Sequence, residues 1–213
     1  MRRRTAILIS GRGSNMEALL EAARDPAFPA EIVLVLSNRP DARGLITARA
    51  AGVQAVAIDH KPYAGNRAAH EAALNAALSA AGVELVCLAG YLRILTPVLV
   101  DAWAGRMLNI HPSLLPAFPG LHTHERALKA GVKVHGCTVH LVSHGMDEGP
   151  ILAQAAVPVL PDDTDDVLAA RVLVQEHRIY PAALRALASG EVPSPAAALA
   201  TLINPLPLPE TLP

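Results

Sequence analysis

The sequence predicts an α/β fold of one domain, in which a doubly wound, mostly parallel sheet is covered by helices. Short β-rich runs alternate with alanine-rich helical stretches through the first half of the chain. These runs are continuously apolar, which is the pattern of strands buried on both faces of a parallel sheet. A length of 213 residues with 52% hydrophobic content suits one domain with a substantial core.

The order of the elements changes between the two halves of the chain. In the first half we expect strands at 5–10, 31–37, 55–59 and 84–90, and helices at 15–24, 42–51 and 66–81. In the second half we expect strands at 106–110, 134–143 and 150–159, and helices at 123–130 and 164–188. Acidic residues around Thr164 suit the capped start of the last helix. The last two strands are expected to form an antiparallel or mixed extension of the sheet.

The domain is expected to span residues 1–190, followed by a Pro-rich tail over residues 191–213. The tail contains prolines at positions 193, 195, 205, 207, 209 and 213. Such a composition is typical of a segment that drapes over a domain or is disordered.

Charge and cysteine content argue against several classes of protein. A formal net charge of −1 provides no broad basic surface for nucleic acid. No apolar run reaches the roughly 18 residues of a membrane helix, because Glu84 and Arg93 interrupt the best candidate. Cys87 and Cys137 form neither a CxxC pair nor a disulfide framework, and we expect buried thiols in a reducing cytosol. We therefore expect a cytoplasmic protein without nucleic-acid or membrane partners.

A glycine-containing loop, GRGSN at 11–15, directly follows the first strand and opens the first helix. Main-chain N–H groups and the helix dipole favour an anion at that position, which predicts a phosphate site. The alternative is a tight strand-to-helix turn, with Ser14 or Asn15 as its cap. A dinucleotide fingerprint is not supported, because Met16 replaces the third glycine and the second strand leads to Asn38 rather than an acid.

Two polar residues, Asn109 and His111, come at the end of the strand at 106–110. Side chains two residues apart in a strand lie on the same side, and ligands of open α/β sheets bind at the carboxyl ends of strands. Each residue also has a structural interpretation, as a turn cap or as a packing histidine. Prolines at 112, 116 and 119 stiffen the loop beside the pair, which favours a preorganised site.

Asp147 lies in a Gly-flanked turn, where an ordinary solvated acid is the simplest interpretation. Sequence spacing alone does not connect it to His111. The pair His122 and His124 could ligate a metal, but no HExxH motif or third ligand of matching spacing accompanies it. We therefore predict no metal site.

Six segments of the chain are GRGSN at 11–15, LAGYLRIL at 88–95, NIHPSLLPAFPGLHTH at 109–124, HGCTVHLV at 135–142, DEGPI at 147–151 and QEHRIYP at 175–181. Together they closely resemble the phosphoribosylglycinamide formyltransferases. The resemblance covers roughly residues 5–190 in order. It implies a Rossmann-like sheet of seven mostly parallel strands, with 10-formyltetrahydrofolate and glycinamide ribonucleotide as substrates and a monomer or homodimer as the assembly.

The resemblance also implies roles for individual residues. The catalytic group falls on Asn109, His111 and Asp147. Ribonucleotide binding falls on Gly13, Ser14, Asn15 and Glu176, although a solvated helix face is the default interpretation of Glu176. Formylfolate binding falls on Arg67, Leu92, Arg93, Ile94, Leu95 and Asn109, and on the loop Ser143, His144, Gly145, Met146 and Asp147. Two positions depart from the family pattern, because residues 143–146 lack the usual acids and Ala68 follows Arg67 where an acid is common.

These residue types suit the attack of an amine on a formyl group. The tetrahedral intermediate carries negative charge on oxygen, and the amide of Asn109 is a suitable donor to it. His111 suits proton transfer, directly or through an ordered water, because an unperturbed histidine titrates near pH 6.5. A carboxylate at Asp147 favours the charged imidazole and orients it.

Enzymes that share the transfer domain are the nearest alternatives. Methionyl-tRNA formyltransferase adds a carboxyl-terminal domain and a basic surface, and formyltetrahydrofolate hydrolase adds an amino-terminal regulatory domain. The first strand begins close to Met1, and GRGSN favours a small phosphorylated acceptor over amino-sugar acceptors. A non-catalytic folate or nucleotide binding module is disfavoured, because Asn109, His111 and Asp147 are all present.

Overall fold

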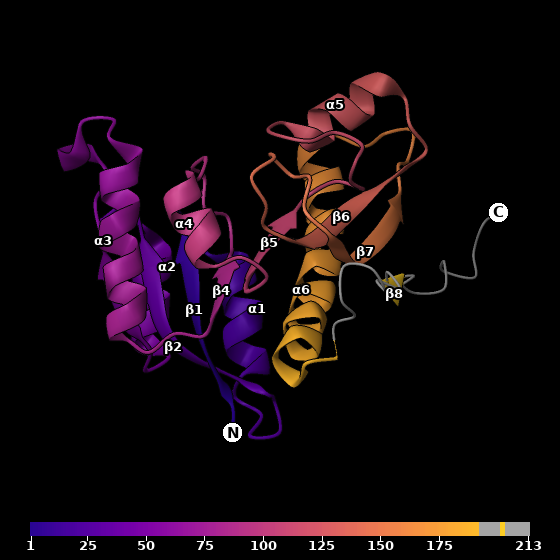
Figure 1. Cartoon of the computed structure of the whole chain (residues 1–213). Coiled ribbons are helices and arrows are strands. Elements are labelled where there is room, and N and C mark those ends of the chain that lie inside the picture. The colour runs from indigo at the N-terminus through magenta and orange to yellow at the C-terminus, as the bar shows by residue number, and fades with distance from the viewer. Residues whose placement is uncertain (192–200, 203–213) are drawn as a thin grey trace.

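The computed structural model describes residues 1–191 and 201–202, and its elements alternate as the sequence predicts (Figure 1). The strands are β1 (Arg3–Ile9), β2 (Ala30–Ser37), β3 (Gln54–Ala57), β4 (Leu85–Leu88), β5 (Met107–His111), β6 (Val134–Leu141), β7 (Ile151–Pro158) and β8 (Thr201–Leu202). The helices are α1 (Ser14–Ala22), α2 (Arg43–Ala50), α3 (Arg67–Ala80), α4 (Pro97–Ala102), α5 (Thr123–Ala130) and α6 (Asp165–Ser189), with a 3₁₀ turn η1 (Lys61–Tyr63).

One sheet runs through the molecule in the order β3-β2-β1-β4-β5-β6-β7-β8. The pairs from β3 to β5 are parallel, β6 is antiparallel to both β5 and β7, and the two-residue β8 pairs with the outer edge of β7. This confirms the predicted doubly wound sheet with its antiparallel extension. The strand order reverses at β1, which lies between β2 and β4, and open α/β sheets bind ligands at such a switch point.

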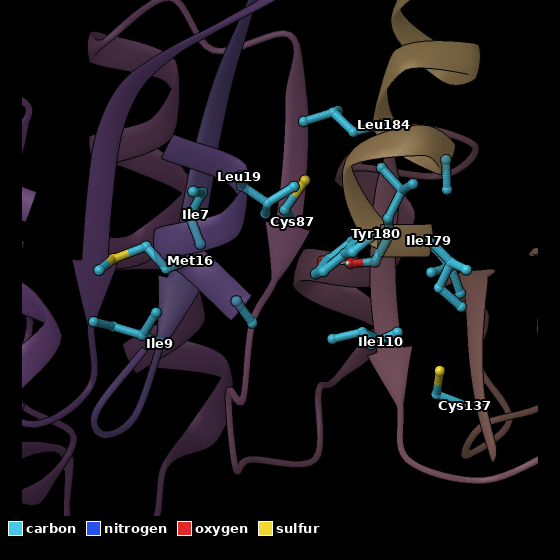
Figure 2. Packing of buried hydrophobic residues seen from close by; sticks show 14 of the residues in the cluster. Ile7, Ile9, Met16, Leu19, Cys87, Ile110, Cys137, Ile179, Tyr180 and Leu184 are labelled. Atoms are coloured by element: carbon cyan, nitrogen blue, oxygen red, sulfur yellow. Dashed lines mark hydrogen bonds between the residues drawn. The ribbon is translucent and has the colours of Figure 1, made fainter. Parts of the chain in front are cut away.

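Two apolar layers hold the helices against the sheet. Helices α1, α2 and α6 pack on one face, while α3 and α4 pack on the other around Leu74, Leu78 and Leu99. Tyr180 of α6 lies inside the first layer (Figure 2), and its hydroxyl donates to Leu88 O at 3.0 Å and to Leu108 O at 3.3 Å. This side chain therefore fixes α6 to β4 and β5, the strands that lead into the candidate site.

Both cysteines are buried free thiols, as expected. Desolvation by burial raises the pKa of Cys87 to about 12 and also raises the pKa of Cys137. Neither thiol is therefore a reactive nucleophile at neutral pH.

The structure adds three short elements that the sequence analysis did not predict, η1, α4 and the two-residue strand β8. Helix α4 has six residues and begins with Pro97, and so it is too short to show a helical period in the sequence. Its stability comes from contacts with α3 rather than from its own propensity. The division into a domain over 1–190 and a tail over 191–213 stays a prediction, because most of the tail lies outside the described residues. Within the described residues, no helix is long and apolar enough to cross a membrane.

Candidate active site

The predicted pair Asn109 and His111 lies in β5, as its third and last residues. Residues two apart in a strand share a face, so both side chains leave the same side of β5. The antiparallel neighbour β6 places His140 opposite Asn109 and Thr138 opposite His111. A histidine of β6 therefore lies beside the carboxyl end of β5, and spacing along the chain did not predict it as part of the site.

His140 fixes the orientation of the Asn109 amide. Its Nδ1 lies 2.9 Å from Leu141 O, and a carbonyl oxygen only accepts, so the ring proton is on Nδ1. Burial is the largest cause of a lowered pKa at His140, which keeps the ring neutral with a free lone pair on Nε2. Asn109 Nδ2 lies 3.1 Å from that nitrogen and donates to it. The second N–H of the same amide is then available to a ligand.

Asp147 meets this pair from the loop between β6 and β7. Its φ of 58° is left-handed, a conformation that aspartate tolerates better than most residues. Its Oδ2 accepts from Gly120 N at 2.8 Å, which ties the loop after β5 to the loop after β6. The structure therefore supplies the spatial link to His111 that sequence spacing did not.

The ring of His111 lies between two acceptor groups. Nε2 lies 3.1 Å from Phe118 O and Nδ1 lies 3.5 Å from Asp147 Oδ2, so both ring nitrogens face acceptors. Asp147 Oδ1 also lies 3.8 Å from His140 Nε2, but this contact is not an ion pair because the buried His140 ring is neutral. The negative charge of Asp147 therefore acts mainly on His111.

The predicted phosphate loop forms the turn between β1 and α1. Gly13 caps α1 with a φ of 82°, and a Cβ there would lie 3.1 Å from the Met16 side chain. Gly44 N donates to Gly11 O at 3.1 Å, and α2 approaches so closely that a Cβ on Gly44 would lie 2.5 Å from Ile9 Cδ1. This packing holds the amino end of α1, where the helix dipole favours an anion.

Glu176 is buried rather than solvated, so the default interpretation of this residue was wrong. It accepts a hydrogen bond of 2.6 Å from Asn15 Nδ2, which joins α6 to the phosphate loop. Burial raises the pKa of the Glu176 carboxyl, and the bond from Asn15 opposes that rise. Among the described residues, Asn15 Oδ1 has no hydrogen-bond partner, which leaves a buried acceptor beside the carboxyl group. The pair forms a polar site at the end of α1.

Apart from Asn109 of β5, the residues predicted to bind formylfolate lie in three separate segments. Leu92–Leu95 connects β4 to α4, with Leu92 and Ile94 largely exposed, and Ser143–Met146 follows β6, where Met146 is also exposed. The second segment reaches toward the first, because His144 Nε2 lies 2.9 Å from Asp101 Oδ1 of α4. Arg67 is exposed in the first turn of α3, and its described hydrogen bonds do not reach β5. Exposed apolar side chains near a polar centre suit a planar organic ligand.

Two further histidines, His124 of α5 and His135 of β6, contact each other. His135 Nε2 lies 3.2 Å from His124 Nδ1, and burial lowers the pKa of both rings, that of His135 to about 4. His122 is exposed beside Glu125. Over residues 1–191, no group of three histidine, cysteine or acidic side chains is arranged to hold a metal ion.

Comparison with known families identifies the chain. The formyl transferase family matches residues 3–184, which includes β1 to β7 and almost all of α6. The chain therefore belongs to the formyl transferase family.

Individual relatives show which members of this family the chain resembles. Phosphoribosylglycinamide formyltransferase of Escherichia coli is 42% identical over 186 residues, covering 87% of each chain. The crystal structure of phosphoribosylglycinamide formyltransferase from Brucella melitensis has a TM-score of 0.84 and 57% identity, covering 91% of this chain and 100% of that chain. A trifunctional purine biosynthetic protein of Drosophila melanogaster is 50% identical over 191 residues. This chain covers only 14% of the length of that protein.

Proposed function

We propose that this chain transfers the formyl group of 10-formyltetrahydrofolate to the amine of glycinamide ribonucleotide. The products are formylglycinamide ribonucleotide and tetrahydrofolate, in purine synthesis. The observation that best supports the proposal is that Asn109, His111 and Asp147 lie together at the carboxyl end of β5. The similarity to enzymes named phosphoribosylglycinamide formyltransferase supports the choice of substrates.

The chemistry is a direct transfer without a covalent enzyme intermediate. The amine nitrogen attacks the formyl carbon, and the carbonyl electrons move onto oxygen to give a tetrahedral intermediate. The free N–H of Asn109 is the donor that stabilises this oxygen. When the intermediate collapses, the bond from carbon to N10 of the folate breaks. The attacking nitrogen loses a proton and N10 gains one, and His111 is the group placed to carry it.

The two substrates are assigned to the two sides of this centre. Gly13, Ser14 and Asn15 receive the ribonucleotide phosphate and sugar, with Glu176 close enough to Asn15 to share the same ligand. The formylfolate is assigned to Arg67, to Leu92–Leu95 and to the loop Ser143–Asp147. We also propose a cytoplasmic protein that works as a monomer or homodimer.

The test is release of the folate product, followed spectrophotometrically with 10-formyltetrahydrofolate in the presence and absence of glycinamide ribonucleotide. We expect turnover only when both are present. Turnover without the ribonucleotide would assign the chain to hydrolysis of formyltetrahydrofolate. If neither mixture turns over, a panel of other amine acceptors separates a different transferase from a protein with no transfer activity, and either result contradicts the proposal.

Replacing His140 tests its role in orienting Asn109. His140→Phe keeps a ring of similar size but removes the Nε2 acceptor, so the Asn109 amide is free to rotate. We expect kcat to fall roughly fivefold with little change in either KM, since one net hydrogen bond contributes about 1 kcal/mol and 1.36 kcal/mol is a factor of ten in rate.

A matched control for this substitution lies on the same strand. His135 is also a buried histidine of β6, but its ring contacts His124 rather than Asn109. We expect His135→Phe to retain wild-type kcat, measured on protein with an intact thermal transition. Equal kcat values in the two variants would show that His140 does not act on catalysis through Asn109.

A further inference from the structure

The segment Leu92–Leu95 has few contacts of its own and is held mainly at its two ends. At the first end, Leu92 N donates to Ser10 Oγ at 2.8 Å, and Ser10 Oγ donates to Asn38 Oδ1 at 2.6 Å. The intervening side chains are exposed or half-buried. A short exposed segment loses much conformational freedom when it becomes ordered. The hydrogen bonds that hold the two ends of Leu92–Leu95 therefore determine its conformation.

Glu71 holds the second end. This residue of α3 is 3% exposed, and its Oε1 accepts from Thr96 N at 2.8 Å. Its Oε2 accepts from Thr96 Oγ1 at 2.6 Å and from Leu99 N at 3.3 Å. Three donors from the start of α4 therefore converge on one buried carboxylate. Such an arrangement is strong because the acceptor is charged.

Helix α4 connects Glu71 to both predicted folate segments. Leu95 directly precedes its cap residue Thr96, and His144 of the second segment contacts Asp101 near its other end. The carboxyl end of α4 has a separate attachment to α3, where Trp103 Nε1 donates to Asn75 Oδ1 at 2.9 Å. Glu71 and Asn75 thus link the same two helices at opposite ends of α4, and only the link through Glu71 adjoins Leu92–Leu95.

We propose that Glu71 is a positioning residue for the formylfolate site, because it seats the start of α4 and so fixes the segment Leu92–Leu95. The inference rests on the proposed function, which assigns that segment to the folate. Glu71 does not touch substrate or reacting atoms in this arrangement. Its loss changes affinity for the folate while leaving the ribonucleotide site and the chemical step largely as they are.

The test compares Glu71→Gln with wild-type enzyme in steady-state assays that vary each substrate in turn. Glutamine keeps the shape of the side chain, but it has one acceptor oxygen where the carboxylate has two, and its NH₂ group faces backbone donors. We expect KM for 10-formyltetrahydrofolate to rise about tenfold, with kcat and KM for the ribonucleotide changed less than about twofold. Thr96→Val removes one of the same hydrogen bonds from the other side and is expected to raise the same KM by a smaller factor.

Asn75→Ala is the matched control, because it breaks the link at the far end of α4. We expect it to lower thermal stability without raising KM for the folate. An unchanged folate KM in both Glu71→Gln and Thr96→Val, or equal changes in the KM values for the two substrates, overturns the inference while the proposed function stands.

If wild-type enzyme shows no transfer, the proposed function fails and the inference is judged by amide hydrogen exchange. Faster exchange over residues 92–96 in Glu71→Gln than in Asn75→Ala supports seating of the segment by Glu71. Equal exchange in the two variants overturns it.

Discussion

Asn109→Ala is expected to lower kcat by about 10²–10³-fold, which corresponds to roughly 3–4 kcal/mol of transition-state stabilisation. The amide is held by His140 Nε2 with one N–H unused, and that group is the neutral donor at the site where charge on oxygen develops. A donor of this kind acts on the transition state more than on the ground state, so the loss falls on kcat more than on either KM. Steady-state assays with both substrates measure this split.

A double variant separates the role of Asn109 from that of His140. If His140 acts through Asn109, then Asn109→Ala combined with His140→Phe has nearly the same kcat as Asn109→Ala alone. Multiplied effects would instead indicate that His140 acts on the reaction independently. A kcat for Asn109→Ala within tenfold of wild type, in protein with normal thermal stability, would exclude Asn109 as the main oxyanion donor.

The sequence predicts those strands and helices whose burial is visible in the local pattern of apolar residues. Strands such as β1 and β4 are apolar on both faces because they lie inside the sheet, so continuous apolar runs predict them. Helix α4 is different, because its six residues are stabilised by Glu71 from a distant part of the chain. A local pattern carries no information about such a long-range partner.

The same distinction applies to the site. Asn109 and His111 are predicted because two residues in one strand share a face. His140 becomes a neighbour of Asn109 only through the register of β5 against β6, and a shift of one residue would turn its side chain to the other face. Its position within HGCTVHLV signals a strand but does not show which residue of β5 it faces. Burial of Glu176 likewise depends on the contact of α6 with α1.

His111→Ala is expected to lower kcat by about 10²–10⁴-fold, because proton transfer by a positioned histidine contributes about that much. The substitution removes the ring whose two nitrogens face Phe118 O and Asp147 Oδ2. Asp147 acts through this ring, so Asp147→Asn is expected to lower kcat less than His111→Ala and to have little further effect in the double variant.

Measurements of substrate binding distinguish a loss of catalysis in these variants from a loss of folded structure. Asp147 also accepts from Gly120 N, and asparagine retains an oxygen that accepts this bond, so the loops after β5 and β6 are expected to stay joined in Asp147→Asn. Dissociation constants for formylfolate close to the wild-type value in both single variants would show an intact site. If Asp147→Asn still lowers kcat severalfold when His111 is already alanine, Asp147 acts on the substrates directly. In that case the carboxylate cannot be only the partner of the His111 ring, and the proton route must include Asp147 itself.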